Sequence, residues 1–195
     1  MLNFASLTGC AIIAGLPEFD DGKIFNSSVL CKPDGTVETY RKTHLFWAEK
    51  QIFDPGDTGF PVQEFKGSTI GMMICFDWVF PEAARTLALG GAQLICHPSN
   101  LVLPFCPAAM ITRSIENRIY TVTANRVGTE HRTGQSLTFI GQSQITGPGG
   151  DVLAALSDSE VGATTAMIDI SESSKMITPT NDLFTDRRPE FYKLK

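Results

Sequence analysis

Apolar and polar residues follow one another along the chain in short blocks, and these blocks predict several strands and two helices. The almost wholly apolar run at 69–75 is typical of a strand buried on both faces. Pro81 and Glu82 then favour the start of a helix that ends near Leu89, and a second helix is expected at 107–118. The other predicted strands lie at 11–15, 24–32, 36–40, 93–97, 119–124, 137–145, 151–156 and 163–170. This mixture of helices and strands indicates a layered α/β or α+β domain.

The stretch at 41–59 is the part of the chain in which no clean hydrophobic period is found. It carries Lys42, His44, Trp47 and Glu49, all of which have polar or aromatic groups that could act on a ligand. Long irregular stretches in compact domains are often functional, so we treat these residues as candidates for chemistry.

Composition and charge exclude several classes of function. The length of 195 residues suits one domain, 1–195, and the net charge of −5 comes from charged residues that are scattered along the chain. Scattered charge argues against a nucleic-acid partner and against a polybasic membrane surface. No apolar run approaches the roughly 20 residues of a membrane helix, and no basic signal-peptide region follows Met1.

The cysteines and histidines point to a reducing compartment and to chemistry without a metal. Five cysteines are present, an odd number with irregular spacing and no C-x-x-C pair, so we expect free thiols and a cytoplasmic protein. The three histidines are too scattered to suggest a zinc site.

Cys75 is the sharpest candidate for catalysis. It ends an apolar strand and precedes a short turn into a helix, which would lift its sulfur out of the sheet toward backbone N–H groups. Such surroundings lower the pKa of a thiol and stabilise a developing oxyanion. The placement is analogous to the nucleophile elbow of serine hydrolases, although the G-x-S-x-G motif is absent. The alternative is a buried structural cysteine.

Charged partners for such a nucleophile occur in the irregular stretch and on a strand. Lys42 could be a fixed cation for an anionic intermediate, and Glu49 could hold that lysine or take a proton; both could instead be solvated surface residues. His44 or His97 could act as a base paired with Cys75, or each could be a packed, hydrogen-bonded histidine.

Ordered short motifs cover nearly the whole chain and are more specific than any one of these residues. They are Gly-Leu-Pro-Glu at 15–18, Tyr-Arg-Lys-Thr-His-Leu-Phe at 40–46, Met-Ile-Cys-Phe-Asp-Trp at 73–78, His-Pro-Ser-Asn-Leu at 97–101, Glu-Asn-Arg at 116–118, Ala-Asn-Arg-Val-Gly at 124–128 and Asp-Arg-Arg at 186–188. In this order they resemble the nitrilase superfamily of carbon–nitrogen hydrolases, and in pattern most of all its archaeal-type aliphatic nitrilases.

The resemblance implies a fold, an assembly and a catalytic set. The fold would be an α+β protein with an α-β-β-α sandwich, paired into homodimers or larger homo-oligomers, and no metal or organic cofactor would be required. Cys75 would be the nucleophile, Lys42 the cation that stabilises the tetrahedral intermediate, and Glu49 the family's second glutamate beside the lysine. The backbone N–H of Phe76 would complete the oxyanion site.

The same resemblance implies the reaction. A nitrile or small amide would be converted to a carboxylate and ammonia through a thioester intermediate, in a pocket lined by Trp78 and Asn100. The substrate itself is not readable from these motifs, because nitriles and amides use the same catalytic set.

One departure from the family pattern changes the expectation. The family's general-base glutamate belongs to an early strand that ends in a Pro-Glu pair, and Glu18 matches a different family position. We therefore expect a chain without the N-terminal strand–helix–strand portion, and so a less stable or self-associating one. The alternative function is a catalytically impaired nitrilase-like module that acts by binding or assembly. A Cys–His transferase or peptidase is a third possibility, which requires a histidine within hydrogen-bond reach of Cys75.

Overall fold

The computed structural model describes residues 1–132 and 134–192, and within them the strands form two main sheets. The larger sheet has six strands in the order β11–β10–β7–β6–β5–β4. Its three central strands run parallel and the outer ones antiparallel. Their bounds are β4 (Val62–Phe65), β5 (Ser68–Met72), β6 (Leu94–Ser99), β7 (Tyr120–Asn125), β10 (Gln144–Thr146) and β11 (Val152–Ala155).

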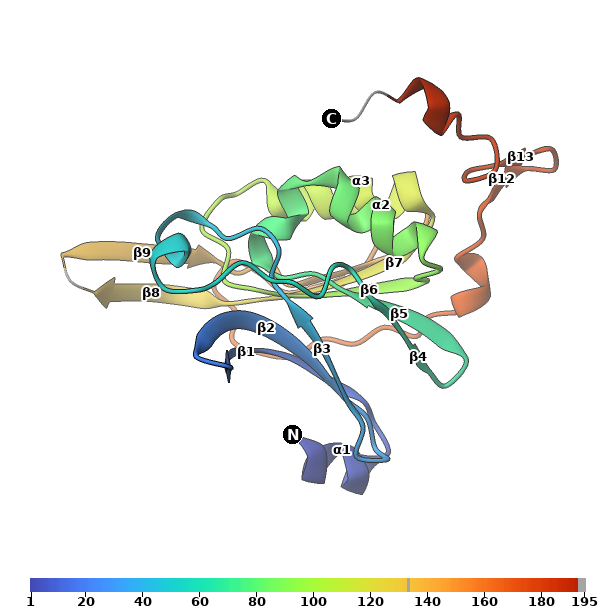
Figure 1. The fold of residues 1–195 in the computed structure, drawn as a ribbon. Helices are drawn as coiled ribbons and strands as arrows, with labels where there is room; N and C mark the ends of the chain where they lie inside the picture. The colour runs from blue at the N-terminus through green and yellow to red at the C-terminus, as the bar shows by residue number, and fades with distance from the viewer. Residues whose placement is uncertain (133, 193–195) are drawn as a thin grey trace.

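Helices and a second sheet cover the two faces of this larger sheet. The helices α2 (Pro81–Leu89) and α3 (Cys106–Asn117) lie together on one face (Figure 1). On the other face lies an antiparallel sheet of β1 (Ile12–Asp20), β2 (Lys23–Cys31) and β3 (Val37–Arg41), with α1 (Leu2–Thr8) beyond it (Figure 1). This layering confirms the expected α+β class.

The core consists of two clusters that meet near residue 75. The first lies between the larger sheet and the helices, where α2 buries Ala83, Ala84, Leu87 and Ala88 along one side. A Cβ at Gly71 would lie 2.9 Å from a Leu87 methyl carbon, so glycine is needed for α2 to pack this closely on β5. The second cluster fills the space between the sheets and contains Leu30, Tyr40, Met72 and Ile74. Cys75 packs against both clusters.

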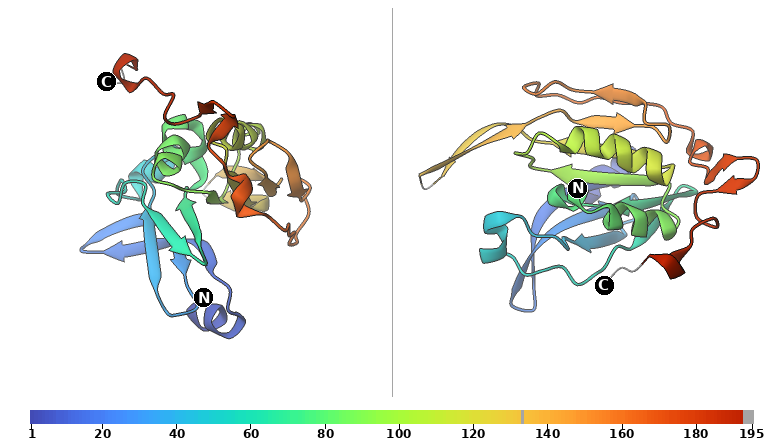
Figure 2. Two further views of the ribbon diagram at one scale, coloured as in Figure 1. Left: turned by 90° about the vertical axis from the view of Figure 1, so that its right-hand side faces the viewer. Right: turned by 90° about the horizontal axis from the view of Figure 1, so that it is seen from above.

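The prediction of one continuous strand at 137–145 is wrong. The chain forms a hairpin of β8 (Val127–Arg132) and β9 (Gln135–Ile140), which extends beyond the layers (Figure 2), and only then enters β10. The break falls at Gly141 and Gln142, whose φ angles of 59° and 56° are left-handed. A Cβ at Gly141 would lie 2.5 Å from the Asp158 carbonyl oxygen, so this turn depends on glycine.

The predicted strand at 163–170 is also wrong as a hydrogen-bonded element. Its side chains alternate between half-buried and exposed, as the sequence suggested, but no ladder joins it to another strand within the described residues. The chain ends in short elements: η3 (Ile170–Glu172), β12 (Met176–Thr178), β13 (Asn181–Asp182) and η4 (Pro189–Phe191). No helix among the described residues is both long and apolar enough to cross a membrane.

Candidate active site

Cys75 is the first residue of a short 3-10 turn, η2 (Cys75–Val79), that follows β5. Its φ angle of 43° is left-handed, a conformation that is uncommon for a residue with a side chain. The buried carboxylate of Asp77 accepts the backbone N–H of Ile74 at 2.9 Å and so closes the start of the turn. Asp77 also accepts the Tyr40 hydroxyl at 2.8 Å and the His44 Nδ1–H at 2.7 Å. The turn that presents Cys75 is therefore tied to the end of the smaller sheet.

The thiol of Cys75 is mostly buried, and burial raises its pKa above the ordinary value. The positive charge of Lys42 and the backbone N–H groups of Asn100 and Phe76 act against this rise, whereas Glu49 adds to it. A cation and two backbone donors thus face a largely buried sulfur. Such an arrangement stabilises negative charge once it develops on the sulfur or on a group bound to it.

Lys42 has no exposed side-chain surface, and its Nζ donates to Glu49 Oε2 at 2.5 Å. Glu49 belongs to the 3-10 turn η1 (Trp47–Gln51), where its carboxylate also accepts the backbone N–H of Phe46 at 2.7 Å. The other carboxylate oxygen accepts the Asn26 amide at 3.1 Å. Three donors therefore fix Glu49, which in turn holds the buried ammonium in one place.

The loop after β3 sets the position of Lys42. The backbone N–H of Gly56 donates to the Lys42 carbonyl at 2.9 Å, and a Cβ at Gly56 would lie 2.0 Å from the Arg41 carbonyl oxygen. Only glycine allows this approach. The neighbouring cation, Arg41, forms ion pairs with Glu18, Asp20 and Asp57 and is not part of the site. Its hydrogen bond holds the pKa of Glu18 below the usual value, which leaves Glu18 ionised and occupied elsewhere.

The structure brings most of the sequence-predicted site residues together. Cys75, Lys42, Glu49 and the Phe76 N–H share one location. Asn100 contributes its backbone N–H to the thiol, and its residue is exposed at the same place. Trp78 packs into the cluster beneath the helices and is 9% exposed, so its contribution to a substrate pocket stays a prediction.

Neither histidine candidate is hydrogen-bonded to the sulfur. The ring of His97 is fully buried and contacts the backbone carbonyl of Cys75 at 2.8 Å, and the ring of His44 contacts Asp77. Burial lowers the pKa of His97 to about 4, so this ring is neutral near pH 7. Within residues 1–132 and 134–192, no hydrogen bond joins either ring to the Cys75 thiol. These contacts favour the packed, hydrogen-bonded interpretation of both residues.

The sequence analysis missed the hydrogen-bonded group that the buried Asp77 and Tyr40 form with the partly exposed His44. A signal for it existed, because an acid three residues after Ile74 has the spacing of a capping box. The Asn100 backbone N–H was also missed, since backbone donors leave no trace in residue identity.

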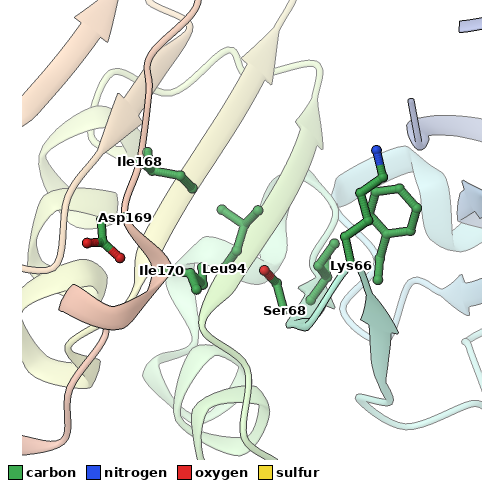
Figure 3. Close-up of a pocket in the computed structure, with 8 residues that line it drawn as sticks. Lys66, Ser68, Leu94, Ile168, Asp169 and Ile170 are labelled. Carbon is green, nitrogen blue, oxygen red and sulfur yellow. The ribbon is translucent and has the colours of Figure 1, made fainter. Parts of the chain in front are cut away.

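The cavity shown in Figure 3 lies away from these groups. It has a volume of about 480 Å³ and is bounded by the β4–β5 hairpin, the start of β6 and the segment at 168–170 (Figure 3). Its Lys66 donates to the Gly9 carbonyl and its Asp169 accepts from Ser171, so both charged groups already have partners. In the described part of the chain no three His, Cys, Asp or Glu side chains are grouped to hold a metal ion.

Comparison with known proteins gives a consistent result. The carbon–nitrogen hydrolase family model matches residues 1–177. A nitrilase from Pyrococcus abyssi is 48% identical over 193 residues, which are 98% of this chain and 72% of that protein. A carbon–nitrogen hydrolase from Helicobacter pylori G27 superposes with a TM-score of 0.89 at 31% identity, covering 97% of this chain and 72% of that one.

A third relative concerns the cysteine itself. An amidase mutant from Nesterenkonia sp. AN1 superposes with a TM-score of 0.73 at 31% identity, covering 80% of this chain and 63% of that one. Its structure shows the result of Michael addition of acrylamide at the active site cysteine. The extent of the family match and the identity to a nitrilase establish that this chain belongs to the carbon–nitrogen hydrolase family and is a hydrolase of the nitrilase type.

Proposed function

We propose that the chain hydrolyses the carbon–nitrogen bond of a nitrile or small amide, with Cys75 as nucleophile and a thioester as intermediate. The observation that carries this proposal is the convergence of the Cys75 thiol, the buried Lys42 with its partner Glu49, and two backbone N–H donors. Relatives of this chain include both a nitrilase and an amidase, so the proposal includes both nitriles and small amides as substrates.

For an amide, the Cys75 sulfur attacks the carbonyl carbon, and the carbonyl oxygen takes up the negative charge. Lys42 and the N–H groups of Phe76 and Asn100 stabilise that charge. The intermediate collapses as the C–N bond breaks, ammonia leaves with the proton released by the thiol, and a thioester remains. Water then attacks the thioester, and the carboxylate and the free thiol are formed. A nitrile takes up one additional water, because its thioimidate must be hydrated before ammonia can leave.

Glu49 has a positioning role in this scheme. Its carboxylate neutralises Lys42 and orients it toward the sulfur, and all three of its hydrogen-bond donors are in place before substrate arrives. A cation that is fixed in advance costs no reorganisation during the reaction, which is the property expected of an oxyanion-stabilising group.

The test is ammonia release on a panel of nitriles and amides, together with acrylamide labelling read by mass spectrometry of the Cys75 peptide. We expect Cys75→Ala to lose the label and to lower ammonia release by roughly a thousandfold or more. Cys10→Ala is the matched control, because Cys10 is an exposed thiol near the end of α1 and should leave both readouts unchanged. Ammonia release that is unaffected by Cys75→Ala would refute the assigned nucleophile, whereas a wild-type chain that releases no ammonia from any compound of the panel would favour a binding or assembly module.

The same proposal extends to compartment and assembly. All five cysteines are free thiols, which supports the reducing cytoplasm as the compartment. Exposed apolar side chains on α1, among them Phe4 and Leu7, support a homodimer or larger homo-oligomer. Size-exclusion chromatography with light scattering measures the assembly directly.

A further inference from the structure

His97 is a buried polar residue whose function the reaction scheme does not use. It lies on β6, beside the parallel strand that leads into Cys75, and its side chain has 1% exposure. Its Nε2 lies 2.8 Å from the backbone carbonyl oxygen of Cys75, and its Nδ1 lies 3.1 Å from the Thr123 hydroxyl. The Ser99 hydroxyl also approaches the ring, at 3.2 Å from Nε2.

The chemistry of these contacts fixes the protonation of the ring. A carbonyl oxygen can only accept, so the hydrogen of the neutral imidazole must be on Nε2, and Nδ1 accepts from the Thr123 hydroxyl. Burial lowers the pKa of His97 to about 4, and the nearby charge of Lys42 also disfavours a second proton. His97 is therefore neutral, and its Nε2–H donates to the carbonyl oxygen of Cys75, which is the nearer of its two neighbours.

The hydrogen bond from His97 to the Cys75 carbonyl also affects the orientation of the Phe76 N–H. The peptide unit between Cys75 and Phe76 is planar, so its C=O and the N–H of Phe76 point in opposite directions in one plane. The Phe76 N–H faces the Cys75 thiol, where it lowers the thiol pKa. Since Cys75 has a left-handed φ of 43°, its backbone needs outside contacts to stay in this orientation.

We propose that His97 is a positioning residue for the oxyanion site: by holding the Cys75 carbonyl, it keeps the Phe76 N–H directed at the sulfur and at the charge that develops beside it. It neither touches the substrate nor transfers a proton. This inference rests on the proposed function, in which Cys75 is the nucleophile.

Two amide variants separate this role from simple filling of the core. The side-chain nitrogen of glutamine can reach the place of Nε2, so His97→Gln retains a donor to the Cys75 carbonyl. Asparagine reaches only the place of Nδ1, so His97→Asn retains a polar group toward Thr123 and loses the donor. If His97 only filled the core, the alkylation profile of the thiol would not differ between the two variants.

The measurement is the alkylation rate of Cys75 by iodoacetamide from pH 6 to 10, read on the Cys75 peptide of folded protein. In His97→Asn we expect the apparent pKa of the thiol to rise by about one unit, so that the rate at pH 8 falls about tenfold. We also expect kcat to fall about 10- to 100-fold at nearly constant KM, as for a misplaced oxyanion donor. For His97→Gln, the alkylation rate at pH 8 and kcat should both lie within about threefold of the wild-type values.

Thr123→Val provides a milder variant in case His97→Asn does not fold. It removes the hydroxyl that orients Nδ1 and should shift the alkylation profile in the same direction by a smaller amount. A wild-type profile in folded His97→Asn or in Thr123→Val overturns the inference, as does a His97→Gln profile that matches His97→Asn. Failure of the proposed function looks different: wild-type Cys75 would then react no faster than the buried Cys31, and ammonia release would not depend on Cys75.

Discussion

The two 3-10 turns that carry the site, η1 and η2, are built by the same local device. In each, an extended residue precedes a first residue with left-handed φ, which is 46° at Trp47 and 43° at Cys75. In each, an acid at the third position accepts the backbone N–H of the preceding residue. The two turns differ in which position carries the functional group of the candidate site, the left-handed first residue or the acid at the third position.

In η1 the acid is the functional group. Glu49 is partly exposed and binds the Lys42 ammonium, whereas the left-handed Trp47 points to the surface and is 55% exposed. In η2 the left-handed residue is the functional group, and the acid, Asp77, is fully buried among Tyr40 and His44.

This difference shows how one turn can serve two purposes. A left-handed first residue directs a side chain away from the strand before it, while the capping acid fixes the angle of the turn. Burial of Asp77 gives η2 a rigid base for a nucleophile, and partial exposure of Glu49 leaves η1 a carboxylate that can still serve a second partner. The equivalent positions should therefore respond differently to the same substitution.

The largest effect is expected from Asp77→Asn. The amide nitrogen that replaces one carboxylate oxygen cannot accept, so either the Ile74 N–H and the Tyr40 hydroxyl or the two His44 donors lose their acceptor. Two orphaned donors should lower the free energy of unfolding by about 4 kcal/mol, measured by urea titration, and slow Cys75 alkylation as well. A loss below about 1 kcal/mol would show that Asp77 does not hold the turn.

The second-largest effect is the pH dependence of the unfolding free energy that arises from His97, the residue that contacts the Cys75 carbonyl of η2. Burial lowers the pKa of this ring from 6.5 to about 4 in the folded protein. The folded state therefore resists protonation, so the stability from this group is complete above pH 6.5 and is lost as the pH falls toward 4. The shift corresponds to about 3 kcal/mol. His97→Gln cannot titrate, and its unfolding free energy should fall less than that of the wild type between pH 7 and 4; parallel curves would contradict this.

The third effect is that of Glu49→Gln, the counterpart of Asp77→Asn. Here the retained amide oxygen can accept from Lys42 and Phe46, while the Asn26 amide can turn to offer its oxygen. The hydrogen bonds survive and only the charge is lost, so we expect a fall of about 2 kcal/mol in unfolding free energy, less than for a fully buried ion pair. Ammonia release should fall at least about tenfold, because the cation is no longer held. An unchanged rate would show that Glu49 has no positioning role.

Local pattern predicted most of the helices and strands, whereas the candidate site residues came from the ordered motifs and the family resemblance that they carry. The helix from Pro81 to Leu89 was predicted with the bounds that the structure has, because a proline start and a glycine end are local signals. The segment at 163–170 has strand-like alternation without a ladder, since pairing depends on a neighbour that its own residues do not specify. His97 contacts the Cys75 carbonyl across 22 positions of sequence, so this contact becomes visible only when β5 and β6 are assembled, whereas the contact of Asp77 with the Ile74 N–H is local.

The smallest effect tests the surface position of η1. At Trp47 a left-handed backbone carries a large, half-exposed side chain, whereas asparagine tolerates that conformation better than most residues. Trp47→Asn should therefore raise the unfolding free energy, measured by urea titration, by about 0.5 kcal/mol, because part of the cost of the left-handed φ is relieved. The rate of Cys75 alkylation, measured by peptide mass spectrometry, should stay unchanged. A loss of more than about 1 kcal/mol would mean that the indole packs on η1 and that both turns depend on their first side chain.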